Sequence, residues 1–81
     1  MDKYSDIIKE MEDSIIKSLE DLPSGYGRRK WGISKNTGIP EDLLTVILKR
    51  LKYAGKIKLI MIWDESTYMP DGSGYCLTYK N

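Results

Sequence analysis

Apolar side chains recur at every third or fourth position along residues 3–22. This spacing follows the 3.6-residue turn of an α-helix, so these side chains fall on one face. The stripe consists of Tyr4, Ile8, Met11, Ile15, Leu19 and Leu22, and it is widened by Ile7 and Ile16. We expect an amphipathic helix of about five turns that ends near Pro23, because proline disfavours a helical backbone in the residue before it.

Two further helices are expected before Gly55. A short polar helix over residues 28–36 has Trp31 and Ile33 as its buriable residues, and a longer helix runs over residues 40–54. Between them, Gly38 suits a tight turn with positive φ, and proline at position 40 is favoured in a first helical turn. The helical repeat assigns two groups to opposite sides of the longer helix. Leu44, Ile47, Leu48 and Leu51 face the core, whereas Asp42, Thr45, Val46, Lys49, Arg50 and Tyr53 face away from it.

The pattern changes to strict alternation after Gly55, which is typical of a strand. One face carries Ile57, Leu59, Met61 and Trp63, and the other carries Lys58, Ile60 and Ile62. We expect the two isoleucines to point outward. Residues 64–74 contain Pro70, Asp71 and Gly72 and predict a long loop, and residues 75–79 predict a second strand that pairs antiparallel with the first. We assign Trp31, Trp63 and Tyr26 to the core and its edge.

The composition limits what the chain can do. Its 81 residues suffice for a single domain, 1–81, with one core. The sequence has no His and one Cys, so we expect neither an internal disulfide nor a metal site. It also lacks a nucleophile–histidine pair and a P-loop, and we therefore expect no enzyme activity, no cofactor and no small-molecule substrate. No apolar run approaches the roughly 20 residues that span a bilayer, and the first residues do not resemble a secretory signal. We expect a cytoplasmic, intracellular protein without membrane contact.

The net charge of +1 conceals an uneven distribution. Residues 1–22 carry a net charge of −4, residues 28–58 carry +7, and residues 59–81 carry −2. A concentrated basic segment suits a polyanion, because each phosphate that it neutralises releases counterions. The same Lys and Arg residues could instead solvate the surfaces of two helices.

Three helices followed by a hairpin, with a glycine turn between the second and third helices, resemble the winged helix-turn-helix family of DNA-binding domains. The similarity is closest over Ile33-Ser34-Lys35-Asn36-Thr37-Gly38-Ile39-Pro40-Glu41-Asp42-Leu43-Leu44, Leu48-Lys49-Arg50-Leu51 and Gly55-Lys56-Ile57. Gly74-Tyr75-Cys76-Leu77-Thr78 is similar to the second wing strand of small archaeal, bacterial and viral regulators. The resemblance implies an α+β fold, a three-helix winged helix-turn-helix with a C-terminal two-stranded β-hairpin wing.

The resemblance also implies a function, namely sequence-specific binding of double-stranded DNA by a transcriptional regulator. The recognition helix, residues 40–54, would lie in the major groove, where base edges distinguish all four base pairs. Thr45, Lys49 and Arg50 are the expected groove contacts. Ser34, Lys35, Asn36 and Thr37 would contact phosphates, with Arg28, Arg29 and Lys30 reaching phosphates farther along.

Other features favour a second class of function. The predicted wing loop contains three acids and neither Lys nor Arg, so we expect it to add little electrostatic affinity for DNA. Leu43 and Val46, with the outward Ile60 and Ile62, would suit a protein–protein interaction module within a larger assembly. RNA binding remains a third alternative.

A homodimer is expected if the chain binds specific DNA, because one small domain covers few base pairs. The first helix, together with Ile60 and Ile62, offers the apolar surface for pairing. Alternatively, Ile7 and Ile16 complete the core of a monomer.

Overall fold

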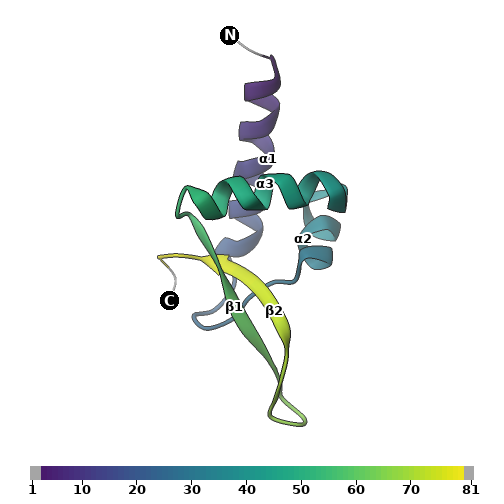
Figure 1. Cartoon of the computed structure of the whole chain (residues 1–81), viewed down its shortest axis with the longest axis vertical. Coiled ribbons are helices and arrows are strands. Elements are labelled where there is room, and N and C mark those ends of the chain that lie inside the picture. The colour runs from purple at the N-terminus through teal and green to yellow at the C-terminus, as the bar shows by residue number, and fades with distance from the viewer. Residues whose placement is uncertain (1–2, 80–81) are drawn as a thin grey trace.

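The computed structural model describes residues 3–79 (Figure 1). Its helices are α1 (Lys3–Glu20), α2 (Lys30–Thr37) and α3 (Glu41–Tyr53), and its strands are β1 (Ile57–Asp64) and β2 (Met69–Leu77). The two strands pair antiparallel as a hairpin. The predicted fold class is confirmed, since an α+β chain of three helices followed by a hairpin has the layout of a winged helix-turn-helix.

The core lies where the C-terminal half of α1, α2, α3 and the base of the hairpin meet. Its buried side chains are Ile15, Leu19, Ile33, Ile39, Leu44, Ile47, Leu48, Leu51, Ile57 and Leu77. Burying an aliphatic side chain of this size contributes about 1.5–3 kcal/mol. All four residues predicted for the inner face of α3 belong to this core, which therefore fixes how α3 crosses α1 (Figure 1).

The molecule is elongated, with extents of 50 × 24 × 20 Å, because α1 and the hairpin project from the core in opposite directions (Figure 1). The two residues that widen the α1 stripe have different roles. Ile16 packs against the core, whereas Ile7 lies on the projecting half of the helix and is 45% exposed. The stripe of α1 is therefore only partly used by this domain.

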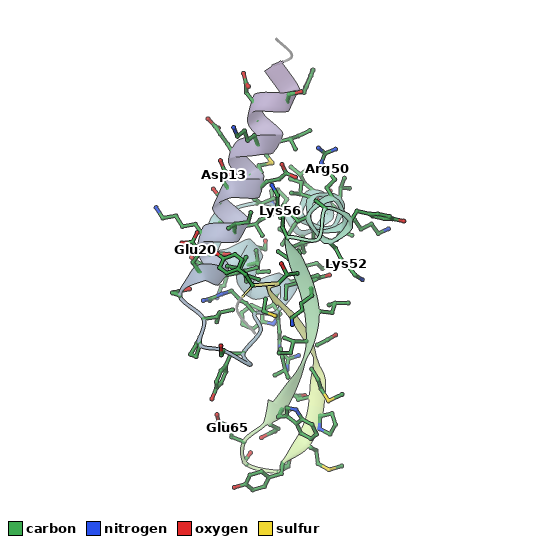
Figure 2. All side chains as sticks on the ribbon, turned by 90° about the vertical axis from the view of Figure 1, so that its left-hand side faces the viewer. Asp13, Glu20, Arg50, Lys52, Lys56 and Glu65 are labelled. Atoms are coloured by element: carbon green, nitrogen blue, oxygen red, sulfur yellow. The ribbon has the colours of Figure 1, made fainter. Side chains whose placement is uncertain are left out.

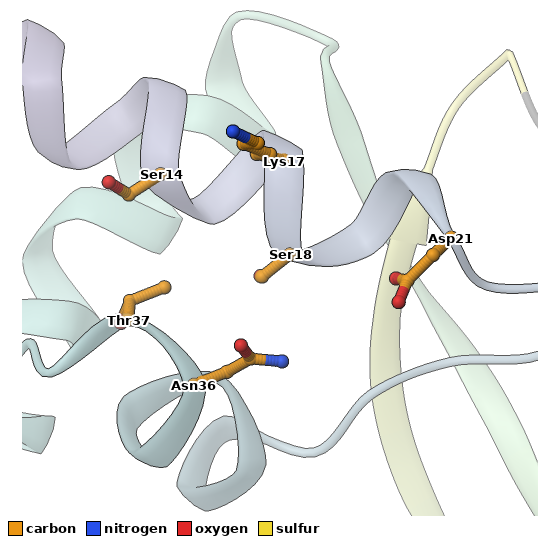
Figure 3. Close-up of a pocket in the computed structure, with 6 residues that line it drawn as sticks. All are labelled: Ser14, Lys17, Ser18, Asp21, Asn36 and Thr37. Atoms are coloured by element: carbon orange, nitrogen blue, oxygen red, sulfur yellow. The ribbon is translucent and has the colours of Figure 1, made fainter.

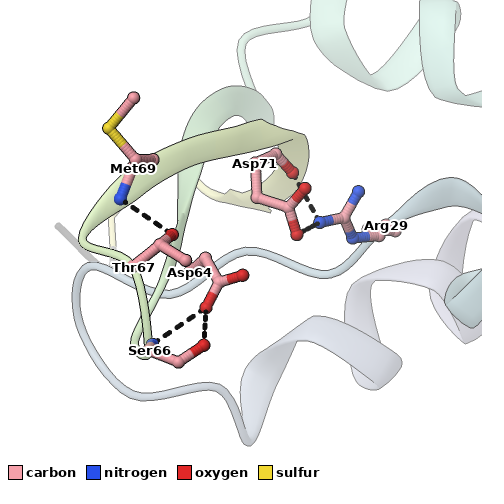
Figure 4. Close-up of polar contacts among 6 residues, drawn as sticks. All are labelled: Arg29, Asp64, Ser66, Thr67, Met69 and Asp71. Atoms are coloured by element: carbon pink, nitrogen blue, oxygen red, sulfur yellow. Dashed lines mark hydrogen bonds and ion pairs between the residues drawn. The ribbon is translucent and has the colours of Figure 1, made fainter.

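The predicted loop over residues 64–74 is wrong, because β2 begins at Met69 and only residues 65–68 connect the strands. Asp64 closes this short turn. Its Oδ1 accepts hydrogen bonds from the Ser66 backbone N (2.8 Å) and from Ser66 Oγ (Figure 4). The Asp64 carbonyl oxygen also accepts a hydrogen bond from the Tyr68 N (2.8 Å).

Asp71 and Gly72, two of the turn-forming residues, lie in a bulge within β2. The pairing changes from Met61 opposite Ser73 to Trp63 opposite Pro70, so two residues of β2 face one residue of β1. Gly72, with φ of 86°, adopts the left-handed conformation that bulges often require. The extra residue belongs to β2, and β1 runs through the irregularity without an insertion.

The predicted outward direction of Ile60 and Ile62 is also wrong. Both are partly buried, and the neighbouring Leu59, Met61 and Trp63 are exposed instead. The isoleucines lie against two glycines: a Cβ added to Gly74 would stand 2.8 Å from Ile62 Cδ1, and one added to Gly27 would collide with Ile60 Cγ2. The absence of side chains at these glycines makes room for the isoleucines on the inner face of the hairpin.

Trp31, Trp63 and Tyr26, which we assigned to the core and its edge, lie outside the core, since each is more than half exposed. Aliphatic residues fill the interior, so these three aromatic rings are left on the surface.

Candidate nucleic-acid interface

The turn between α2 and α3 is held by side chains as well as by backbone. Gly38 has φ of 78° and donates its N–H to the Ser34 carbonyl oxygen (2.8 Å). Ser34 Oγ donates to the Ile39 carbonyl oxygen (2.6 Å), and Thr37 Oγ1 donates to that of Ile33 (2.7 Å). A hydroxyl has a single proton. In this conformation the two predicted phosphate contacts Ser34 and Thr37 use theirs to build the turn.

The exposed side of α3 is organised around Lys49 and Tyr53. Tyr53 is 94% exposed, and both residues border two open surface hollows. One hollow is completed by Lys52, and the other by Glu12, Val46, Arg50 and Ala54. Lys52 and Tyr53 were not among the predicted site residues, although steps of three and four from Lys49 place them beside it on a helix.

The other two predicted groove contacts have partners within the protein. Thr45 Oγ1 donates to the Glu41 carbonyl oxygen (2.9 Å) and accepts from Lys30 Nζ (3.0 Å), which joins α2 to α3. Arg50 Nε lies 3.7 Å from Glu12 Oε2 on α1. The Arg50 side chain is 57% exposed, so this ion pair is weak and its guanidinium stays accessible.

Arg28 precedes α2 and does not belong to it, which corrects the predicted start of this helix. Its backbone pairs with Tyr75 of β2 through two hydrogen bonds, from Arg28 N to Tyr75 O (2.9 Å) and from Tyr75 N to Arg28 O (2.8 Å). Arg28 therefore forms an isolated β-bridge beside β2. Its guanidinium lies 3.5 Å from the Asp21 carboxylate, and its Nε is buried without a hydrogen-bond partner.

Arg29 connects the start of α2 to the wing. Its guanidinium pairs with the Asp71 carboxylate at 2.9 Å and also donates to the Asp71 carbonyl oxygen (Figure 4). Within the wing turn, the pKa of Asp64 is lowered from its ordinary value, because the side chain and backbone of Ser66 donate hydrogen bonds to the carboxylate. Asp64 and Asp71 of the wing thus accept hydrogen bonds from this chain's own side chains and backbone.

Lys35 and Asn36 lie on surfaces other than the exposed face of α3. Lys35 Nζ stands 5.8 Å from the centre of the Trp31 ring, within the range of a cation–π contact. Asn36 borders a polar hollow between α1 and α2 (Figure 3), whose lining also contains Ser14, Lys17, Ser18, Asp21 and Thr37. The ten predicted contacts therefore do not form one continuous surface.

Two acidic residues of α1 and a lysine of α3 lie on different sides of the molecule. Asp13 and Glu20 of α1 lie on one side, and Lys52 lies on the other with α3 (Figure 2). Within residues 3–79, no ion pair joins Lys49 or Lys52 to a carboxylate. Glu41 and Asp42 occupy the first turn of α3, where negative charge is favourable to the helix dipole. Positive charge on α3 therefore increases toward its C-terminal half.

We searched the described part of the chain for metal sites, membrane-spanning helices and reactive cysteines. Residues 3–79 contain no cluster of three metal-binding side chains and no helix long and apolar enough to cross a bilayer. The single cysteine, Cys76, is buried. No protein-family model matches this sequence, and the search of curated proteins finds no relative.

Proposed function

We propose that this chain binds double-stranded DNA through the C-terminal half of α3 and regulates transcription. An α-helix with its side chains is about 10–12 Å across, which fits the roughly 12 Å width of the major groove. The helix-turn-helix arrangement supports the proposal, because its turn holds α2 behind α3 and leaves one long side of α3 exposed.

One observation carries the proposal, namely the unpaired positive charge on the exposed side of α3. Lys49 and Lys52 form no ion pair within residues 3–79, and Arg50 is held only by a long contact to Glu12. By contrast, Arg28 and Arg29 already have carboxylate partners. A phosphate that approaches α3 therefore meets cations that need not first leave an internal partner.

Sequence-specific readout would come from the same helix. Arg50 is the side chain with the geometry to bind guanine through two hydrogen bonds, and Glu12 competes for it only weakly. Lys49 and Thr45 flank the same surface. Tyr53, almost fully exposed, adds a hydroxyl donor beside the lysines for a phosphate oxygen.

Fluorescence polarisation of a labelled duplex pool across a salt series tests the proposal. With about three to five phosphates neutralised per protomer, the logarithm of the binding constant falls with a slope of about −3 to −5 against the logarithm of salt concentration. Lys49→Ala and Lys52→Ala each reduce the magnitude of that slope by about 0.9. The matched control is Lys17→Ala, an exposed lysine on α1, which leaves the slope unchanged.

A salt-independent signal, or an equal loss from all three lysine substitutions, would refute binding through α3. Selection of duplexes from a random pool then measures specificity. Enrichment of a motif that Arg50→Ala abolishes supports base readout by α3, whereas an unenriched pool limits the protein to phosphate binding.

A protein–protein interaction module is the second candidate, and the apolar surface of the wing favours it. Leu59, Met61, Trp63 and Met69 are each about half exposed or more, and residues 64–74 contain no Lys or Arg. Such side chains suit a protein surface better than a phosphate backbone. Absence of salt-dependent duplex binding, together with tight capture of a defined protein, would replace the first proposal with this one.

A further inference from the structure

The outer edge of β1 is an unpaired strand edge. The sheet consists of β1 and β2, and the additional pairing by Arg28 is on Tyr75 of β2. Among residues 3–79, no strand pairs with the free side of β1, which is the left-hand edge of the hairpin in Figure 1 and faces the viewer in Figure 2. A free edge presents unpaired N–H and C=O groups that another strand can bind.

This edge has little of the usual protection against pairing, since the charged residues of β1, Lys58 and Asp64, lie near its two ends. β1 is eight residues long, contains neither Pro nor Gly, and has no inserted residue, because the bulge belongs to β2. Its apolar residues occupy both faces, with Leu59, Met61 and Trp63 on the exposed side and Ile60 and Ile62 on the inner side. Long, regular and apolar edges of this kind associate unless they are covered.

The sequence of β1 is complementary to itself in one antiparallel register. When Met61 stands opposite Met61 of a second copy, Leu59 faces Trp63 and Ile60 faces Ile62. The same register sets Lys58 opposite Asp64 at both ends, so opposite charges meet. Apolar side chains that face each other across two strands, and opposite charges that do so, stabilise the pairing of the strands.

We propose that two copies of this chain dimerise by joining their β1 strands into one continuous sheet. This assigns the homodimer surface to the wing, in place of α1 with Ile60 and Ile62. The two-fold axis of such a pairing is perpendicular to the sheet, so both copies direct α3 toward the same side. This arrangement suits two half-sites on one duplex, but dimerisation itself does not depend on DNA.

Sedimentation equilibrium of DNA-free protein, from micromolar to millimolar concentration, tests the proposal. Wild type is expected to shift from the 9.3 kDa monomer toward twice that mass. Met61→Lys places two like charges opposite each other at the two-fold axis and weakens dimerisation about tenfold or more. Met61 is 49% exposed, so the fold tolerates the lysine. The matched control is Met69→Lys on β2, 62% exposed, which dimerises like wild type.

A second measurement uses disulfide formation. Met61→Cys brings two thiols together across the axis, where facing Cα atoms of antiparallel strands stand about 4.5–5.5 Å apart, within disulfide range. Mild oxidation gives a covalent dimer of Met61→Cys and none of Met69→Cys, while the native Cys76 stays buried.

Two results would overturn the proposal. One is a monomer at every concentration. The other is a dimer that survives Met61→Lys but is lost in Ile7→Lys, which would place the interface on α1. The salt-dependent duplex titration is a separate measurement. A dimer that does not bind DNA refutes only the proposed function. A monomer that binds DNA refutes only the proposed dimer.

Discussion

Gly74→Ala tests how closely residues 27 and 28, which precede α2, pack against the hairpin. Gly74 lies in β2, and its φ is not in the left-handed region, so alanine is acceptable to the backbone itself. The added Cβ would stand 2.8 Å from Ile62 Cδ1 and 3.0 Å from both Arg28 N and Gly27 C. Carbon atoms at optimal separation are about 3.5–4.0 Å apart. Each of these neighbours must therefore retreat by roughly half an ångström or more.

The three contacts differ in how they can be relieved. Ile62 Cδ1 is the end of a flexible side chain and can rotate away. The Gly27 and Arg28 atoms are backbone, and Arg28 is fixed by its two hydrogen bonds to Tyr75. Overpacking of this kind costs about 1–3 kcal/mol, and lengthening either hydrogen bond adds part of its roughly 0.5–1.5 kcal/mol. We expect Gly74→Ala to lower the free energy of unfolding by about 2 kcal/mol.

Urea unfolding followed by circular dichroism measures this loss, which corresponds to a fall in Tm of roughly 8–16 °C for a domain of this size. Adding Ile62→Val removes only the Cδ1 contact, so most of the loss should persist in the double variant. Gly32→Ala is the control, because its Cβ meets only the flexible Arg28 side chain, with Cγ at 3.4 Å and Cδ at 3.9 Å, and alanine favours helix α2 by up to about 1 kcal/mol. A neutral Gly74→Ala would refute the close seating of residues 27 and 28 on β2.

Three further outcomes are expected. Leu48→Ala, in the core, should cost about 2–5 kcal/mol of stability in the same urea assay, and a loss below 1 kcal/mol would contradict the orientation of α3. A double-mutant cycle on the exposed Arg29 and Asp71 pair should give a coupling of at most about 1 kcal/mol. The Asp64 carboxylate should titrate by NMR below the ordinary Asp pKa of about 3.9, and Ser66→Ala should raise that pKa. Because the folded pKa is the lower one, this stabilisation is complete above the unfolded pKa and disappears as the pH falls through the folded pKa.

Local signals in the sequence were sufficient for the helices and for the turn between α2 and α3. The apolar repeat identified the inner face of α3, and Gly38 does adopt the positive φ that its turn requires. The hairpin was harder to predict. Pro70 and Gly72 are turn residues by composition, yet Pro70 pairs with Trp63 of β1 and Gly72 lies in the bulge beside it, which no local rule reveals.

Alternation along β1 gave two faces but could not say which one is covered. Gly27 and Gly74 make room for Ile60 and Ile62, and both are distant from β1 in the sequence. The same limit applied to the site, because Arg29 meets Asp71 and Arg50 meets Glu12 only through the folded chain. Residue type predicted the candidates for phosphate contact, but it could not show which of them already have partners.

The projecting half of α1 also affects how the molecule fluctuates. Its fully buried residues, Ile15 and Leu19, both lie in the last two turns, so the first turns are anchored by little tertiary packing. Opening of a helix end without such packing requires only local fraying. Amide hydrogens of residues 7–10 should therefore exchange with solvent far faster than those of residues 15–19, which exchange only when the domain unfolds. A fraction of the native molecules would therefore have a frayed N-terminal end of α1 while their core stays intact.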